Sequence, residues 1–139
     1  MFDVALSAAG AQISFATSCD ENFPPEHIID GKDDTFWSST GLFPQEFVVT
    51  FASLMNINTI KIECSNVRKL LIERSVQNEP DDFEPVEQKD MENSDGQWQS
   101  EEISVSNMTA VHLKFTVMAA YDHFVAVHRL HVDGNAVHG

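Results

Sequence analysis

The sequence predicts an all-β protein, an antiparallel β-sandwich of about eight strands. Three observations lead to this prediction. Apolar and polar residues alternate with a period of two over several segments, which is typical of half-buried strands. Sequences rich in Gly, Pro, Asn and Asp separate these segments and predict turns. No long segment repeats its apolar residues at helical spacing, which argues against a helical core.

The alternation is clearest in four segments. Alternate side chains of a strand point to the same face, so each segment predicts one inward-facing set. The predicted inward sets are Phe47, Val49 and Phe51 in QEFVVTF; Ile60, Ile62 and Cys64 in INTIKIEC; Val111, Leu113, Phe115 and Val117 in AVHLKFTVM; and Leu130 and Val132 in VHRLHVDG.

Other elements are predicted from weaker signals. The pair Pro24–Pro25 before EHIID predicts a short helical turn that ends at Gly31. Residues 78–100 are polar and acidic, and predict loops with one edge strand. Weaker strands are expected at residues 3–7, 12–18, 69–75 and 101–106.

Length and charge bound what the protein can do. The 139 residues predict a single β-sandwich domain over residues 1–139, with a frayed tail at 135–139. The 22 acidic and 8 basic residues give a formal charge of −14, which repels phosphate backbones and anionic lipid. Nucleic-acid binding and membrane insertion are therefore not expected. The charge favours divalent cations and basic protein faces as partners, or it serves only to keep the protein soluble.

The cysteines and the N-terminus indicate the compartment. Cys19 and Cys64 lie far apart in the sequence and form no CxxC motif, which predicts free thiols in a reducing environment. The first ten residues lack the basic region and the apolar run of a signal peptide. No apolar run reaches the roughly 18 residues of a membrane helix. We therefore expect a soluble, intracellular protein.

The stretch IIDGKDDTFWSST, residues 28–40, is the main candidate for a functional site. Asp30, Asp33, Asp34 and Thr35 supply oxygen ligands, and Gly31 allows a sharp turn. Hard cations such as calcium take six to eight oxygen ligands in a flexible cage. The spacing is not that of an EF-hand, because the central glycine and the final glutamate of that loop are missing. The alternative is an Asx-type turn with solvated carboxylates.

The same stretch resembles the signature of the galactose-binding-like, discoidin-type jelly-roll family, in which an Asp-Gly is followed by a Thr five residues after the Asp and then by a Trp. Together with ATSCDENFPPEHIIDG, FPQEF and YDHFVAVH, it is similar to one branch of that family, the intraflagellar transport protein 25 family. The similarity covers nearly the whole chain. It implies a jelly-roll fold.

The resemblance also implies a structural calcium ion. Asp30 and Thr35 would be side-chain ligands, the backbone carbonyl of His27 and an oxygen of Asp33 would join them, and Trp37 would pack beneath the loop. Many calcium-binding relatives complete the cage with a Glu in the final strand. This sequence departs from that pattern, because Arg129 stands near the corresponding place.

The resemblance further implies the partners. They are a Rab-like small GTPase, intraflagellar transport protein 27, as heterodimer, and the intraflagellar transport B complex, which carries cargo. The implied location is the cilium or flagellum and the cytoplasm around the basal body. The alternative function is a carbohydrate- or small-ligand-binding sandwich with a structural calcium ion.

No catalytic motif is present, and we expect no enzymatic activity. HExxH, a Cys-His zinc pattern and GxSxG are all missing. His128 and His131 are three residues apart, which on a regular strand places them on opposite faces. Cys64 is expected to be inert packing. His112 is expected on the polar side of its strand, with His123 in a loop and His138 in the tail.

A protein partner is expected to meet loop tips or one sheet face. Glu101 and Glu102, with the acidic stretch before them, would attract a basic face. Exposed rings would serve as buried anchors, or would simply pack within their own loops. The candidate residues of this surface are Phe23, Leu42, Phe43, Tyr121, His123 and Phe124.

Overall fold

The architecture was analysed in a computed structural model that describes residues 4–5, 9–17, 25–30, 36–40, 44–79, 81–92, 98–121 and 124–137. Of residues 39, 40, 106, 107 and 124 it describes only the backbone. The elements are strands β1 (Gln12–Ala16), β2 (Trp37–Thr40), β3 (Gln45–Ser65), β4 (Val67–Ser75), β5 (Glu84–Asp90), β6 (Gln99–Ala120) and β7 (Phe124–Ala136), and the 3-10 helix η2 (Pro25–Ile29).

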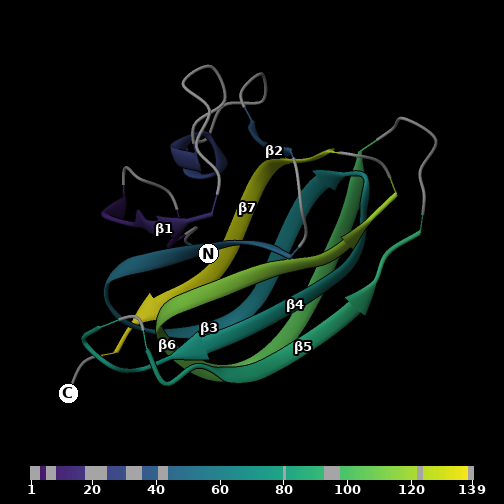
Figure 1. The fold of residues 1–139 in the computed structure, drawn as a ribbon. Helices are drawn as coiled ribbons and strands as arrows, with labels where there is room; N and C mark the ends of the chain where they lie inside the picture. The colour runs from purple at the N-terminus through teal and green to yellow at the C-terminus, as the bar shows by residue number, and fades with distance from the viewer. Residues whose placement is uncertain are drawn as a thin grey trace.

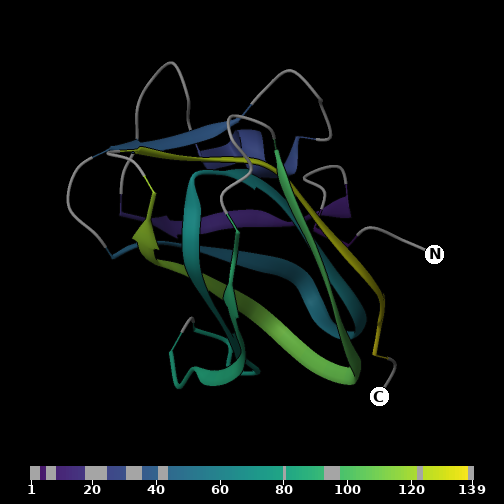
Figure 2. The same cartoon turned by 90° about the vertical axis from the view of Figure 1, so that its right-hand side faces the viewer.

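All strand pairs are antiparallel, and the strand order is β2-β7-β3-β6-β4-β5, with β1 paired to β3. The long strands β3 and β6 belong to two layers. Residues 45–50 of β3 join β1 and the second half of β6, whereas residues 55–65 join β7 and the first half of β6. Figure 1 shows the two layers crossing, and Figure 2 shows both long strands turning sharply from one layer into the other. The result is the predicted antiparallel jelly-roll sandwich.

The number of strands differs from the prediction, because the described residues hold seven. The separate strands predicted at 45–51 and 57–64 are one continuous strand, β3, and those at 101–106 and 110–118 are joined in β6. Neither 45–65 nor 99–120 contains Gly or Pro, so the chain changes layer through irregular pairing between Thr50 and Met55 instead of a turn.

The strand predicted at residues 3–7 is wrong for the two of these residues that the structure describes. Val4 and Ala5 lie in a turn, and the Val4 N–H donates to the carbonyl of Val132 at 2.9 Å. The predicted helical turn is confirmed as η2, and the predicted edge strand within 78–100 is confirmed as β5. Of the predicted frayed tail, residues 135 and 136 belong to β7, and Val137 N–H donates to Leu54 O.

The core lies between the two layers. The predicted inward residues are buried, except for Val111, which is half-buried. Phe47 and Phe115 stack at 5.0 Å between ring centroids across the β3–β6 pair. Trp37, fully buried as predicted, meets Phe47 edge-on at 5.4 Å and links β2 to the opposite layer. Offset and edge-on arrangements are those that aromatic rings favour, so this trio ties the layers together.

Two buried polar side chains brace the turns. Gln99 donates to the carbonyls of Val67 and Glu92 at 2.8 and 2.7 Å, and accepts from the Val67 N–H at 3.0 Å. His112 Nε2–H donates to the Gln77 carbonyl at 3.0 Å, and the Thr50 hydroxyl lies 2.8 Å from His112 Nδ1. His112 therefore lies on the outward side of β6, as predicted, and is a structural residue. Buried polar groups persist in folds when they are satisfied in this way.

A bulge in β7 changes which residues face outward. Glu63 pairs with Arg129 but Cys64 pairs with Val127, so His128 is an extra residue in the ladder. Val127 and Leu130 both belong to the core, although they are three residues apart. His128 follows Val127 and His131 follows Leu130, so both histidines lie on the face opposite the core. The prediction that they lie on opposite faces of the strand is therefore wrong.

Candidate functional site

The predicted calcium loop is described at both ends. His27 lies in η2, and Asp30 follows directly after it. Asp33 and Thr35, the other predicted ligands, lie outside the described residues, as does Asp34. Carbonyl groups of a helix point toward its C-terminal end, so the His27 carbonyl points toward Asp30 and the loop that follows.

The two ends of the loop are joined at its base. The Nδ1–H of His27 donates to the carbonyl of Phe36 at 3.2 Å. Ile28 and Ile29 of η2 and Trp37 of β2 are all buried in the core. Both flanks of the 31–35 segment are therefore anchored in the core.

The donor set of this loop fits a hard cation. Within the described ranges, no three or more His, Cys, Asp and Glu side chains are grouped so that they could hold a metal ion. The predicted site would combine the His27 carbonyl and Asp30 with oxygens of Asp33 and Thr35. Carboxylate, carbonyl and hydroxyl oxygens are the ligands that calcium takes. Arg129, which stands near the place where many calcium-binding relatives have a Glu, lies in β7 opposite Glu63.

An aromatic cluster adjoins the exit of the loop. His128 stacks on Trp98 with ring centroids 4.0 Å apart and 11° between planes, and Phe36 lies 5.5 Å from the His128 ring. The Ser65 hydroxyl lies 2.8 Å from His128 Nε2. Burial lowers the pKa of His128 below its usual value, and nearby Glu63 partly opposes this effect. We call Phe36, Trp98 and His128 the aromatic rim.

The aromatic rim runs from the loop flank at Phe36 to the exposed ring of Trp98. Trp98 is 47% exposed although one of its ring faces is covered by His128. The loop flank at His27 contacts Phe36, and Phe36 contacts His128. An exposed indole on a rigid support is the kind of side chain that anchors a protein partner. The sequence analysis missed Trp98, which follows the polar segment NSDGQ; its isolation as a large ring in that segment was the available signal.

Most residues of the predicted docking surface cannot be placed. Phe23, Leu42, Phe43 and His123 lie outside the described residues, and the Phe124 side chain is not described. Tyr121 is 42% exposed, and its hydroxyl donates to the Met91 carbonyl at 2.6 Å. Of the two predicted acidic residues, Glu102 is exposed and Glu101 is half-buried.

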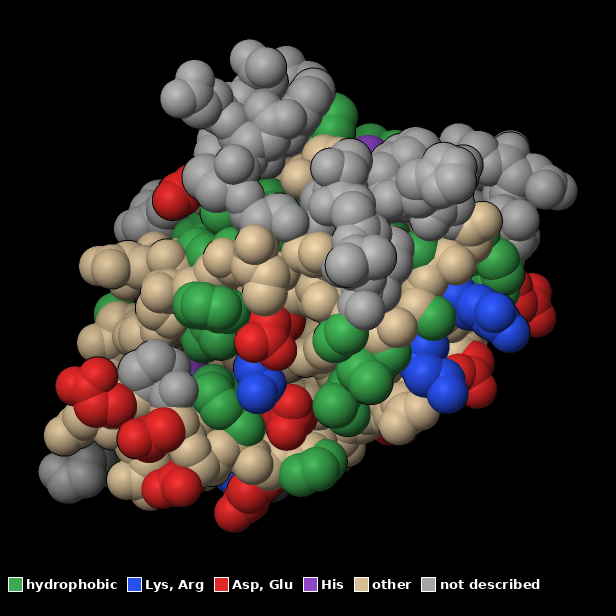
Figure 3. All heavy atoms as spheres, in the orientation of Figure 1, with side chains coloured by type: hydrophobic (Ala, Val, Ile, Leu, Met, Phe, Trp, Pro, Cys, Tyr) green, Lys and Arg blue, Asp and Glu red, His purple; other side chains and the backbone are tan. Residues whose placement is uncertain are grey.

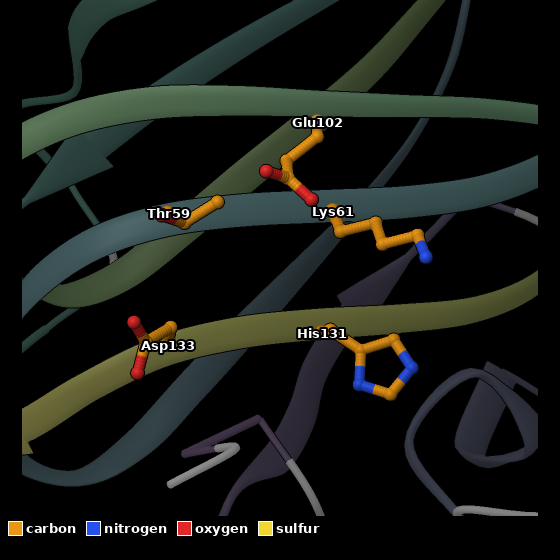
Figure 4. A pocket seen from close by; sticks show the side chains of 5 residues that line it. All are labelled: Thr59, Lys61, Glu102, His131 and Asp133. Atoms are coloured by element: carbon orange, nitrogen blue, oxygen red, sulfur yellow. The ribbon is translucent and has the colours of Figure 1, made fainter. Parts of the chain in front are cut away.

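A shallow groove of about 280 Å³ crosses the outer face of β3, β6 and β7. Figure 4 shows the middle strand, β3, carrying Thr59 and Lys61, with Glu102 on β6 to one side and His131 and Asp133 on β7 to the other. Lys61 also lies 3.6 Å from Glu63. The groove presents both signs of charge, which is typical of a solvated or protein-facing sheet surface.

Cys64 is a packing residue, as predicted. It is fully buried, and its thiol lies 3.7 Å from Gln99 Oε1. Burial, together with the charge of Glu101, raises the pKa of the thiol to about 12. Cys64 is therefore not a nucleophile at neutral pH. Cys19 lies outside the described residues.

The fold is that of the F5/8 type C domains, and the chain belongs to that family, whose profile matches residues 12–130. Within it, the chain belongs to the intraflagellar transport protein 25 family. It is 43% identical to the human intraflagellar transport protein 25 homolog over 97% of this chain and 94% of the relative. It is 40% identical to the Chlamydomonas reinhardtii protein over 96% of this chain and 70% of the relative. The chain is thus an intraflagellar transport protein.

Solved structures confirm the jelly roll. A family 32 carbohydrate-binding module of Clostridium perfringens NanJ, solved with galactose, matches with a TM-score of 0.77 at 19% identity, over 94% of this chain and 98% of that one. A chitosan-binding module from Paenibacillus sp. IK-5 matches with a TM-score of 0.78 at 19% identity, over 96% and 100% of the two chains. At these identities the likeness shows the fold alone.

The described part of the chain contains no helix of the length and apolar character needed to cross a bilayer.

Proposed function

We propose that this chain is a non-enzymatic subunit of the intraflagellar transport B complex, where it pairs with a Rab-like small GTPase, intraflagellar transport protein 27, and supports cargo transport in the cilium or flagellum. Family membership carries the proposal, because the relatives align along nearly the whole chain. Their names describe a transport protein and the names of the structural neighbours describe binding modules, which supports a role without catalysis.

The proposal includes one structural calcium ion in the loop between η2 and β2. The closed base of the loop, made by His27 and Phe36, and the oxygen donors around Asp30 support it. The ion would supply the positive charge that keeps neighbouring carboxylates from repelling one another. His27 and Asp30 would hold it together with Asp33 and Thr35.

The aromatic rim is the part of the described surface that best suits the GTPase. Trp98 presents apolar area at small cost in conformational entropy, because His128 already fixes its ring. Phe36 joins this rim to the loop. A loop made rigid by calcium would therefore hold the rim in one arrangement for docking.

Co-expression with the GTPase subunit tests the proposal. We expect the two chains to elute together from a size-exclusion column at equal stoichiometry, with the GTPase loaded with either GDP or a GTP analogue. Separate elution in both nucleotide states would contradict the proposed heterodimer.

A second candidate function is carbohydrate binding with a structural calcium ion. It is favoured by the match to a module solved with galactose. Calorimetric titration of the chain with galactose and with chitosan oligosaccharides separates the two functions. The transport proposal predicts no heat of binding for either sugar, whereas the second candidate predicts saturable binding.

A further inference from the structure

The two layers of the sandwich leave one side open. Within the described ranges, β5 pairs with β4 alone, and residues 99–110 of β6 pair with β3 alone. Each segment is therefore the edge of its layer. The two edges line a common groove of about 620 Å³, which we call the β5–β6 groove. Edge strands present unpaired N–H and C=O groups and accept an additional strand readily.

Part of the β5 backbone faces this edge. The Met91 N–H points toward β4, where it donates to the Arg68 carbonyl at 2.8 Å, so the Gln88 N–H, three residues earlier, points to the open edge. There it donates only to the carboxylate of its own neighbour Glu87, at 3.2 Å, a local bond that an added strand can replace. Pro85 lacks an N–H and sits beside an irregularity in the β4–β5 pairing, as expected for an edge strand. Across the groove, residues 105–107 of β6 fall in the pairing gap between Ser104 and Met108.

Side chains of the two edges form the floor of the groove, and Arg74 closes one end. Val86, Val105 and Met108 are half-buried and pack against the core from the two edges. Arg74 donates to the Thr109 carbonyl at 2.7 Å and lies 3.2 Å from a carboxylate oxygen of Glu84. Its guanidinium thus joins β6 to β5 and fixes their separation.

The acidic charge beside the groove favours a basic occupant. Residues 79–90 carry six acidic side chains, all exposed, against Lys89 as the one basic side chain of that segment. In Figure 3 acidic side chains gather at the lower left, at the end of the molecule where β4 ends and β5 begins, and Lys and Arg gather at the right. A basic strand is attracted here and an acidic one is repelled.

We propose that the β5–β6 groove binds an extended, basic segment of another protein chain, which adds as a strand to the β5 edge. Basic side chains of the segment would face Glu84 and Glu87, and apolar side chains at alternate positions would cover Val86 and Met108. Such strand addition draws affinity from main-chain hydrogen bonds and specificity from side-chain pockets. The proposal is independent of the calcium ion and of the GTPase.

The test uses a synthetic peptide of alternating Lys and Val, labelled for fluorescence anisotropy, with the full chain. We expect saturable binding that weakens at least tenfold in the double variant Glu84→Lys/Glu87→Lys. The control is Glu26→Lys/Asp133→Lys, which changes the net charge equally on η2 and β7 and should bind as the unmodified protein does. All variants are compared only after thermal melts confirm the fold.

Two further measurements test strand addition itself. Gln88→Pro removes the edge N–H and should weaken binding, and an N-methylated peptide of the same sequence should not bind. Bound peptide should slow hydrogen exchange in residues 84–90. The proposal is overturned if both charge variants lose binding equally, if an acidic alternating peptide binds as well, or if the N-methylated peptide binds with unchanged affinity.

Discussion

The interior between the two layers and the aromatic rim beside the loop are stabilised by different means. The interior is a continuous set of buried apolar side chains, in which Phe115, Phe47 and Trp37 contact one another as well as many neighbours. The rim depends on single contacts, such as that of His27 with Phe36 and that of His128 with Ser65. Changes in the interior should therefore affect folding, whereas changes at the rim should affect binding.

The largest effect is expected for Phe115→Ala in the interior. The change removes a fully buried ring that stacks on Phe47. Deletions of this kind lower the free energy of unfolding by about 3–5 kcal/mol. Urea denaturation followed by tryptophan fluorescence measures it. The matched control is Phe15→Ala on β1, where the ring is 48% exposed and a much smaller loss is expected.

Gln99→Ala should cause the next largest loss in the free energy of unfolding. It leaves the Val67 N–H and the carbonyls of Val67 and Glu92 without their side-chain partner in a buried setting. An unsatisfied buried polar group costs about 1–3 kcal/mol. Gln88→Ala, on an exposed part of β5, should change the free energy of unfolding by less than about 0.5 kcal/mol. Equal effects in the two variants would contradict a bracing role for Gln99.

Trp98→Ala should separate binding from folding. Removing an exposed anchor ring is expected to weaken affinity for the GTPase subunit roughly tenfold, about 1.4 kcal/mol. The melting temperature should change little, since the ring is half exposed. Surface plasmon resonance provides the affinity. Tyr121→Ala, also exposed but bonded to Met91, serves as the comparison. Unchanged affinity in Trp98→Ala would remove the rim from the interface.

Asp30→Ala should abolish stabilisation by calcium. Calcium at ten times its dissociation constant stabilises a folded protein by about 1.4 kcal/mol through mass action. We expect the melting temperature of the unmodified protein to rise with calcium and that of Asp30→Ala to stay constant. Asp133→Ala, on the opposite end of the chain, should retain the rise. If the unmodified protein shows no calcium-dependent rise, the calcium proposal fails.

The smallest effect concerns pH and His128. Burial lowers the pKa of His128 in the folded protein, so the unfolded chain binds more protons just below pH 6.5. The contribution of His128 is therefore fully present above pH 6.5 and is lost as pH falls toward the lowered pKa. We expect His128→Phe, which keeps a ring against Trp98, to show a shallower loss of stability between pH 7 and pH 5. An identical slope in both proteins would contradict this.

The same contrast explains what the sequence could predict. The apolar alternation identified the interior, from Phe47 to Val132, because inward and outward residues of a strand differ in kind. The burial of Trp37 followed from the family resemblance. The bulge at His128 could not be predicted, because one extra residue shifts the alternation of β7 without any Gly or Pro to mark it. The continuous β3 was not predicted, because alternation suggested two separate strands, although residues 45–65 contain no Gly or Pro that would end a strand.

The candidate site was harder to predict than the core. Oxygen-rich spacing suggested Asp30 as a ligand and the resemblance added His27, and both stay predictions; the structure adds the hydrogen bond from His27 to the Phe36 carbonyl. Trp98 was missed because its role depends on stacking with a residue 30 positions away, and distant contacts leave no local pattern. The β5–β6 groove could likewise not be predicted from the sequence, because the strand order decides which strands lie at an edge.

Native mass spectrometry of the chain co-expressed with the GTPase subunit and purified without chelator tests the central claim most directly. The account predicts one dominant species with one copy of each chain and one additional calcium ion on this chain. A spectrum of the isolated chain at its apoprotein mass, with the GTPase subunit appearing separately, would contradict it.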